Sequence, residues 1–289
     1  MWESVPEIEE ASRKFDPGKP ARNPLHNRMP ETCPAEITAI YRYPVKGLSP
    51  EPLGAVALAV GETLPADRRY AIENGPSGFD PGEPKWMSKA YFLMLQRDEW
   101  LAGLQSRFDD ASDALTICEN GRLVARGNLE TADGRAIIEQ FLAARFAGRI
   151  KGPPKIISGG GHSFSDVAKK VVSIINLNTV DAIEDLVGQP VHPLRFRANL
   201  HLRGWPAWHE FDLLGQTLAA GDARLKVVER ITRCAAINVD PETAARDLDI
   251  QHTLQRRLGH GDCGIYAEVV AGGNVTTGDQ VMIEAPAFL

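Results

Sequence analysis

The stretch Leu225-Lys-Val-Val-Glu-Arg-Ile-Thr-Arg-Cys234 predicts an apolar β-strand that ends at a cysteine. Asn238-Val-Asp-Pro241 follows within a few residues, so the thiol stands where the strand gives way to a turn and can face a cavity. Arg233 directly precedes the cysteine and Arg230 is close in sequence, and cations near a thiol favour the thiolate, which binds metals and attacks electrophiles. Most free cysteines are instead small buried hydrophobic residues. This stretch alone therefore leaves two interpretations of Cys234 open.

The composition is that of a globular protein with one large or two modest domains. The chain has 289 residues, of which 43% are hydrophobic, enough for a sizeable core. Its formal net charge of −6 argues against a general basic surface that binds nucleic acid. No apolar run approaches the roughly 18 to 20 residues that span a bilayer, and the acidic N-terminus lacks the apolar segment of a secretory signal. We therefore expect a cytoplasmic protein with no membrane span and no nucleic-acid partner.

Several common sites leave no signature in this sequence. The four cysteines, Cys33, Cys118, Cys234 and Cys263, are far apart and form no Cys-x-x-Cys pair, so neither a zinc ribbon nor an iron–sulfur cluster is indicated. No two of the seven histidines form a His-x-x-x-His pair, which disfavours a zinc hydrolase. The glycine motifs of serine hydrolases, nucleotide hydrolases and dinucleotide-binding domains are also absent.

The chain divides into three parts by composition. Residues 1–35 are charged and rich in proline, which predicts a flexible extension, and Met29 is a second candidate for the true start. Short apolar segments bounded by glycine, proline and asparagine follow and predict a β-rich domain at 36–150. The glycine- and proline-rich segment 148–162 is the predicted boundary to a second domain at 151–286.

Local patterns predict several elements within these domains. Apolar residues at helical spacing predict an amphipathic helix over part of 88–108 and a second helix face over 137–146. The segment 115–125 predicts a hairpin that turns at Asn120-Gly121, a dipeptide that tolerates positive φ at both positions. A second hairpin is predicted at 266–283, where the chain closes.

Four further motifs accompany the Cys234 stretch in one order: Tyr41-Arg-Tyr-Pro-Val-Lys46-Gly, Asp67-Arg-Arg-Tyr70, Arg195-Phe-Arg-Ala-Asn199 and Cys263-Gly-Ile-Tyr266. From about Glu36 to Glu284, their order and spacing resemble the MOSC family, the molybdenum-cofactor sulfurase C-terminal domain, with its N-terminal partner domain. The resemblance is closest to the two-domain, amidoxime-reducing branch. It implies an α+β, mainly β fold, with a β-barrel MOSC domain, an associated N-terminal β-barrel-like domain and a few peripheral helices.

The resemblance also implies a molybdenum cofactor, a pyranopterin whose dithiolene chelates the metal and whose phosphate needs cations or N–H donors. Cys234 would be the soft metal ligand and the catalytic residue. The cofactor-binding residues implied are Lys46, Arg68 and Arg197 for the phosphate, Asn199 and Tyr266 for the pterin or the oxo ligands, and Arg233. Plainer interpretations stay open: a surface ion pair for each basic residue, a turn-stabilising amide for Asn199 and a core aromatic for Tyr266.

Two positions depart from the family pattern. Gly47 stands where many relatives have serine, so one contact to the cofactor is missing. Cys263 stands where relatives have an aromatic residue; it is either a core cysteine or, if it faces the same cavity, a redox partner for Cys234. The loop Gly159-Gly-Gly-His-Ser-Phe-Ser-Asp166 resembles the family loop before the central strand and is either an anion-binding loop or a flexible linker.

The function implied is a molybdenum-dependent oxidoreductase that reduces small N-hydroxylated or N-oxide compounds. Because the ferredoxin-like module of some relatives is absent, we expect electrons from a separate ferredoxin-, cytochrome- or flavoprotein-type donor. The alternative is a sulfur carrier with a persulfide on Cys234, supplied by a separate pyridoxal-phosphate-dependent desulfurase; cofactor storage without turnover is a third possibility. We predict that charge reversal at Arg197 weakens cofactor retention more than reversal at Arg256, a solvent-facing helix residue.

Overall fold

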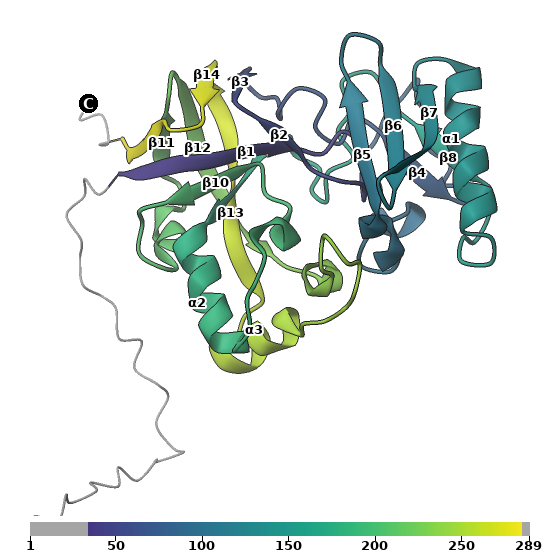
Figure 1. Cartoon of the computed structure of the whole chain (residues 1–289). Helices are drawn as coiled ribbons and strands as arrows, with labels where there is room; N and C mark the ends of the chain where they lie inside the picture. Colours follow the sequence, from purple (N-terminus) through teal and green to yellow (C-terminus); the bar gives the residue numbers. More distant parts are fainter. Residues whose placement is uncertain (1–33, 285–289) are drawn as a thin grey trace, which may run out of the picture. The chain divides into compact units, whose positions relative to one another are not determined.

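The computed structural model describes residues 34–284 and confirms a mainly β protein (Figure 1). The predicted extension at 1–35 lies almost wholly outside the described residues, as does Cys33. Within 34–284 there are 15 strands, three α-helices and five short 3-10 helices. No helix of this part is long and apolar enough to cross a membrane.

Seven strands form a closed barrel in the order β10-β9-β13-β12-β11-β15-β1, and pairing of β1 with β10 closes it. Their bounds are β1 Ala35–Arg42, β9 Val172–Asn176, β10 Leu200–Arg203, β11 Thr217–Ala220, β12 Ala223–Thr232, β13 Asp262–Ala271 and β15 Gln280–Ile283. The pair β9 and β10 is parallel, and the other barrel pairs are antiparallel. A short strand, β2 (Glu51–Leu53), extends the sheet beyond β1.

Alternating side chains explain why β12 becomes a barrel strand. Leu225 and Val227 are buried in the barrel core, whereas Lys226 between them faces solvent, as the period of two in a strand requires. Each buried aliphatic side chain of this kind contributes roughly 1.5–3 kcal/mol. The predicted strand that ends near Cys234 is confirmed.

Strands β4 to β8 form two small sheets apart from the barrel. A three-stranded sheet holds β5 (Leu104–Asp109), β6 (Ala114–Glu119) and β7 (Arg122–Asn128), and β4 (Ala71–Asn74) pairs with β8 (Pro154–Ile157). Helix α1 (Ala132–Arg145) packs against β7 and β8. It begins at Thr131, whose side chain accepts a hydrogen bond from Gly134 N at 3.1 Å. A Cβ on Gly127 would lie 2.0 Å from Gly134 O, so only glycine lets the helix approach β7 this closely.

The remaining elements cover the barrel ends and connect the strands: β3 Ala55–Leu58, β14 Gly273–Thr276, α2 Leu177–Val187, α3 Ile250–Leu258, η1 Lys89–Tyr91, η2 Glu99–Gly103, η3 Pro193–Phe196, η4 His209–Leu213 and η5 Ala235–Asn238. Helices α2 and α3 pack on each other over a core of aliphatic residues that also contains Cys263. This core lies directly behind η3 and η5, the two turns that carry Arg197 and Cys234.

The structure confirms some predicted elements and corrects others. The hairpin at 115–125 turns at Asn120-Gly121 with φ of 52° and 74°, and the helix over 137–146 is part of α1. The amphipathic helix predicted over part of 88–108 does not form: this segment contains only the short 3-10 helices η1 and η2 and the start of β5. The closing hairpin at 266–283 is also wrong, because β13 and β15 pair with other barrel strands and β14 pairs with β3.

The two predicted domains exchange strands. Strand β1, from the first half of the sequence, pairs with β10 and β15, and β3 pairs with β14. The boundary near residue 150 stays a prediction, but the barrel is complete only with β1.

Candidate functional site

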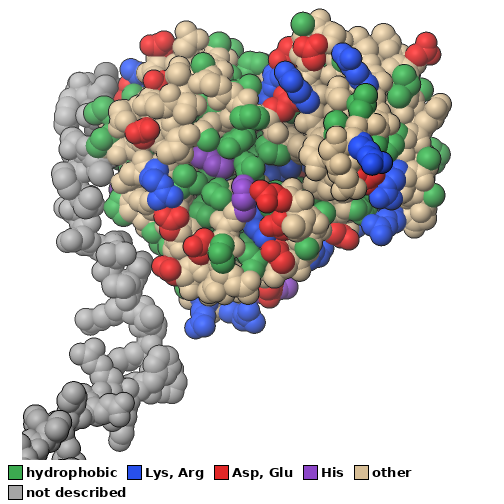
Figure 2. Space-filling model, in the orientation of Figure 1, with side chains coloured by type: hydrophobic (Ala, Val, Ile, Leu, Met, Phe, Trp, Pro, Cys, Tyr) green, Lys and Arg blue, Asp and Glu red, His purple; other side chains and the backbone are tan. Residues whose placement is uncertain are grey.

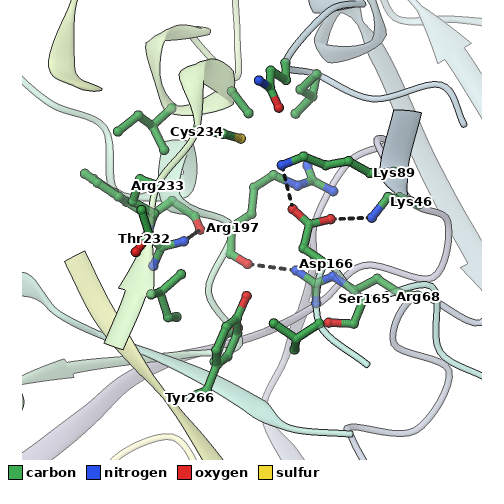
Figure 3. A pocket seen from close by; sticks show the side chains of 18 of the residues that line it. Lys46, Arg68, Lys89, Ser165, Asp166, Arg197, Thr232, Arg233, Cys234 and Tyr266 are labelled. Carbon is green, nitrogen blue, oxygen red and sulfur yellow. Dashed lines mark hydrogen bonds and ion pairs between the residues drawn. The ribbon is translucent and has the colours of Figure 1, made fainter. Parts of the chain in front are cut away.

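One cavity of about 360 Å³ collects every site residue that the sequence singles out (Figure 3). These residues are Lys46, Arg68, Arg197, Asn199, Arg233, Cys234 and Tyr266. They come from the turn after β1, the turn before β4, the segment between η3 and β10, the end of β12, and β13. Folding thus places together side chains that the sequence separates widely; their roles as ligands stay predictions.

The cavity is cationic although the chain is acidic overall. Seven basic residues line it against three acidic ones, a formal excess of four positive charges, while the whole chain carries −6. The basic residues are Lys46, Arg68, Lys89, Arg195, Arg197, Arg230 and Arg233, and the acidic ones are Asp67, Asp166 and Glu229. On the face drawn in Figure 2, by contrast, basic and acidic side chains are interspersed and form no single basic patch.

Two lysines meet at one carboxylate inside the cavity. Lys46 Nζ donates to Phe164 O at 2.9 Å and to Asp166 Oδ1, and Lys89 Nζ donates to Asp166 Oδ2 at 3.1 Å (Figure 3). Burial lowers the pKa of Lys46. Burial alone would raise the pKa of Asp166, but the two ammonium groups hold it well below its ordinary value, so the carboxylate is ionised. Sequence reasoning missed Lys89 and gave Asp166 no role of its own.

The guanidinium groups of two arginines contact the same aromatic ring. The guanidinium groups of Arg68 and Arg197 lie 4.6 Å and 4.3 Å from the centre of the Tyr43 ring, within the range of a cation–π contact. Both arginines have left-handed backbone, with φ of 51° and 52°, and Arg68 Nη2 donates to Arg197 O at 2.9 Å. Asp67 pairs with Arg68. These contacts fix where the two cations point.

Arg197 carries a charge that no carboxylate of residues 34–284 pairs with. Its Nη2 donates to Leu48 O at 2.8 Å, a neutral acceptor. Burial lowers its pKa to about 10, and the nearby Arg68 adds to the lowering. The group is still charged at neutral pH, so it is an uncompensated cation that faces the cavity (Figure 3).

Arg233 is also held without a carboxylate. Its Nε donates to Cys263 O and its Nη1 to Phe196 O, both at 2.7 Å. Its Nη2 is buried and has no hydrogen-bond partner among the described residues. A buried donor without a partner is costly, and an anionic ligand in the cavity is the kind of group that satisfies it.

The thiol of Cys234 is half-buried and opens on the cavity. It stands at the N-cap position of η5, where the strand ends. The two arginines near it in sequence contact other groups: Arg233 donates to carbonyl oxygens, and Arg230 lies 4.5 Å from the centre of the Phe211 ring. Lys89 instead points to the thiol and interacts with it, about half the chain away in sequence (Figure 3).

The two residues proposed to contact the pterin differ in whether their polar groups already have hydrogen-bond partners in the protein. Asn199 is 1% exposed; its Oδ1 accepts from Ser173 N and Oγ at 3.1 and 2.7 Å, and its Nδ2 donates to Tyr41 O at 3.0 Å. These contacts favour the plainer interpretation, a structural amide. Tyr266 directs its hydroxyl into the cavity and has no hydrogen-bond partner in the described part of the chain, and burial raises its pKa (Figure 3).

Of the two positions that depart from the family pattern, Gly47 lines the cavity and Cys263 does not. Cys263 is fully buried beneath α2 and α3, where burial raises its pKa to about 12, and it does not line the cavity. Gly159, Gly160 and Gly161 line a different cavity, of about 520 Å³. Only the end of that loop, at Asp166 and its neighbour, reaches the first cavity.

Comparisons with known proteins found distant similarities. Among solved structures the chain is similar to the YUAD protein from Bacillus subtilis, with 14% identity over 86% of this chain and 95% of that one and a TM-score of 0.42. It is also similar to YiiM from Geobacillus stearothermophilus (20% identity, 39% of this chain, 54% of that one, TM-score 0.32) and to YiiM from Escherichia coli (19%, 40%, 55%, 0.30). The chain thus covers about half of each YiiM chain. The search of curated proteins gave no match.

A family model supplies the more specific result. The model described as "MOSC domain" matches residues 157–282, which span β9 to β15 and hence six of the seven barrel strands together with Arg197, Cys234 and Tyr266. The chain therefore carries a MOSC domain, a domain associated with the molybdenum cofactor, at residues 157–282.

Proposed function

We propose that this chain binds a molybdenum cofactor in the cationic cavity and reduces small N-hydroxylated or N-oxide compounds with electrons from a separate donor protein. The observation that supports the proposal most is the convergence on a single cavity of one thiol and several arginines that have no carboxylate partner within residues 34–284. The MOSC domain supports the cofactor. The reaction and the donor rest on the resemblance to the amidoxime-reducing branch.

The donor set fits such a cofactor better than a bare metal ion. Residues 34–284 contain no group of three or more histidine, cysteine, aspartate or glutamate side chains that is able to hold a metal by itself. A pyranopterin brings its own sulfur ligands, so the protein needs to add only one soft ligand and cations for the phosphate. Cys234 offers the first, and the unpaired guanidinium of Arg197 and the unpartnered Nη2 of Arg233 offer the second.

The chain's own residues then have distinct tasks. Cys234 would hold the metal, and the phosphate would be bound through the N–H groups of Lys46, Arg68, Arg197 and Arg233. Tyr266 keeps its proton at neutral pH because burial raises its pKa, so its hydroxyl is available as an O–H donor in the cavity. When bound, the cofactor supplies two-electron redox chemistry at its metal. Two electrons and two protons convert an N–OH group into N–H and release one water.

The test is reduction of a simple N-hydroxylated base by the purified full chain and a chemical electron donor. We expect formation of the deoxygenated base with the wild type and none with Cys234→Ser. Cys118→Ser is the matched control, because Cys118 is also a half-buried free cysteine but lies on β6, away from the cavity. Equal turnover in both variants would contradict the role of Cys234.

The same purified proteins distinguish the two alternative functions. Mass spectrometry that finds a persulfide on Cys234, with no molybdenum and no turnover, would replace the proposal by a sulfur carrier that works with a separate pyridoxal-phosphate-dependent desulfurase. Molybdenum without turnover on any N-oxygenated compound would instead indicate storage of the cofactor.

A further inference from the structure

Asp166 occupies the part of the cavity where an anionic group would be most stable. Its carboxylate accepts hydrogen bonds from Lys46 Nζ and Lys89 Nζ, and its charge also acts on Arg197 and Tyr266 (Figure 3). Lys46 comes from the turn after β1 and Lys89 from η1, so two separate elements meet at one pair of oxygens. A phosphate oxygen satisfies the same two donors in the same way.

The Asp166 side chain is not fixed by the rest of the protein. Among the described residues its two oxygens accept hydrogen bonds only from the two lysines, and the side chain is 45% exposed. It belongs to the segment 158–171, which contains no helix or strand and includes a run of three glycines at 159–161. Lys46, by contrast, is 9% exposed and has a second acceptor at Phe164 O. Phe164 is held in turn, because it is buried and its N–H donates to Arg68 O at 2.8 Å. Lys46 is therefore the more fixed partner, and the carboxylate, which follows Phe164 in the chain, is the more movable one.

We propose that Asp166 is an internal competitor for the anion site: its carboxylate neutralises Lys46 and Lys89 until an anionic group of the ligand takes its place. The inference deepens the proposed function, since the ligand's anionic group would be the phosphate of the cofactor. A carboxylate that merely orients the lysines predicts the opposite effect of mutation, because its loss would weaken anion binding. The sign of one affinity change therefore decides between the two roles.

The experiment measures binding of inorganic phosphate to the full chain, freed of cofactor, by titration calorimetry. Asp166→Asn should bind phosphate more tightly than the wild type by about tenfold or more, because two partly buried ion pairs no longer have to be broken. Asp181→Asn is the matched control: Asp181 is exposed, pairs with Arg203 on the surface, and does not line the cavity. Its affinity for phosphate should equal that of the wild type. Adding Lys89→Met to Asp166→Asn should remove the gain.

A second measurement follows the segment itself. Phosphate should increase amide hydrogen exchange of residues 165–171 in the wild type, as the carboxylate leaves the lysines, and should leave exchange unchanged in Asp166→Asn. Equal or weaker phosphate binding by Asp166→Asn, or no measurable binding by either protein, would overturn the inference. Molybdenum in the purified wild type would still support the proposed function in that case. Tighter binding by Asp166→Asn in a chain that never holds molybdenum would keep the inference and refute the function.

Discussion

Replacing Arg197 by glutamine should distinguish the effect of this residue on folding stability from its effect on cofactor binding. Its guanidinium is charged and half-buried, and among residues 34–284 it contacts Leu48 O and the Tyr43 ring but no carboxylate. Its pKa of about 10, against an ordinary 12.5, corresponds to roughly 3 kcal/mol by which the folded chain disfavours the charged form. The hydrogen bond and the cation–π contact together stabilise the charged form in the folded chain by about 2 to 3 kcal/mol. The two amounts nearly cancel, so Arg197→Gln should change the free energy of unfolding of the cofactor-free chain by less than about 1 kcal/mol.

Cofactor retention should respond very differently. A bidentate contact between arginine and phosphate in a partly buried site contributes about 2 to 3 kcal/mol, so its loss should weaken binding by roughly 30- to 150-fold. Charge reversal to glutamate should weaken it further, since a carboxylate then faces the phosphate. Arg256 is the control, because it lies on the exposed face of α3 with a side chain that is 70% exposed.

The assay compares urea unfolding of the cofactor-free chains with the molybdenum content after extensive dialysis. Arg197→Gln should unfold near the wild-type midpoint and lose its molybdenum, and Arg256→Gln should match the wild type in both measurements. A variant that keeps its molybdenum but unfolds several kcal/mol more easily would show that Arg197 is a structural residue, and the reasoning would be refuted.

Two further predictions concern stability. Burial lowers the pKa of His201 from 6.5 to about 4, so between these pH values the unfolded chain binds more protons than the folded chain. The free energy of unfolding should therefore be highest above pH 6.5 and fall by roughly 2 kcal/mol from pH 7.5 to pH 5. His201→Gln should remove this part of the pH dependence of urea unfolding. Gly47 has φ of +87°, and a Cβ there would lie 3.2 Å from Leu93 O and 3.1 Å from Leu101 Cδ1. Gly47→Ser should therefore cost about 2 kcal/mol, more than Gly61→Ala, where φ is +70° but no atom lies within 4 Å; equal midpoints for the two variants would contradict the steric part of this argument.

Short sequence motifs predicted most of the candidate site residues, because each of these residues lies in a recognisable local pattern. Cys234 ends an alternating strand, and Lys46 and Arg68 lie in turns beside strands. Such turns place their side chains at the end of the barrel whatever the distant sequence is. Local patterns likewise predicted the short strands, the helix face of α1 and the hairpin at Asn120-Gly121, whereas the closure of the strands into a barrel was implied by the family resemblance.

Long-range contacts were not predictable. Lys89 lies in a segment whose apolar spacing predicts a helix, and its approach to Cys234 depends on packing between residues far apart in sequence. The closing strands carry a period of two but no information about which neighbour each will pair with, so β15 joins β1 rather than β13. For Asn199, the deciding contact with Tyr41 O spans 158 residues. Local sequence identifies the residue types of the site, and tertiary packing decides which of them are free to bind a ligand.

Whether Cys234 holds molybdenum can be measured as the metal content of the full chain purified from molybdenum-replete cells. We expect about one molybdenum atom per chain in the wild type and in Cys118→Ser, and less than about a tenth of that in Cys234→Ser. Molybdenum that is absent from all three proteins, or present equally in all three, would contradict this expectation.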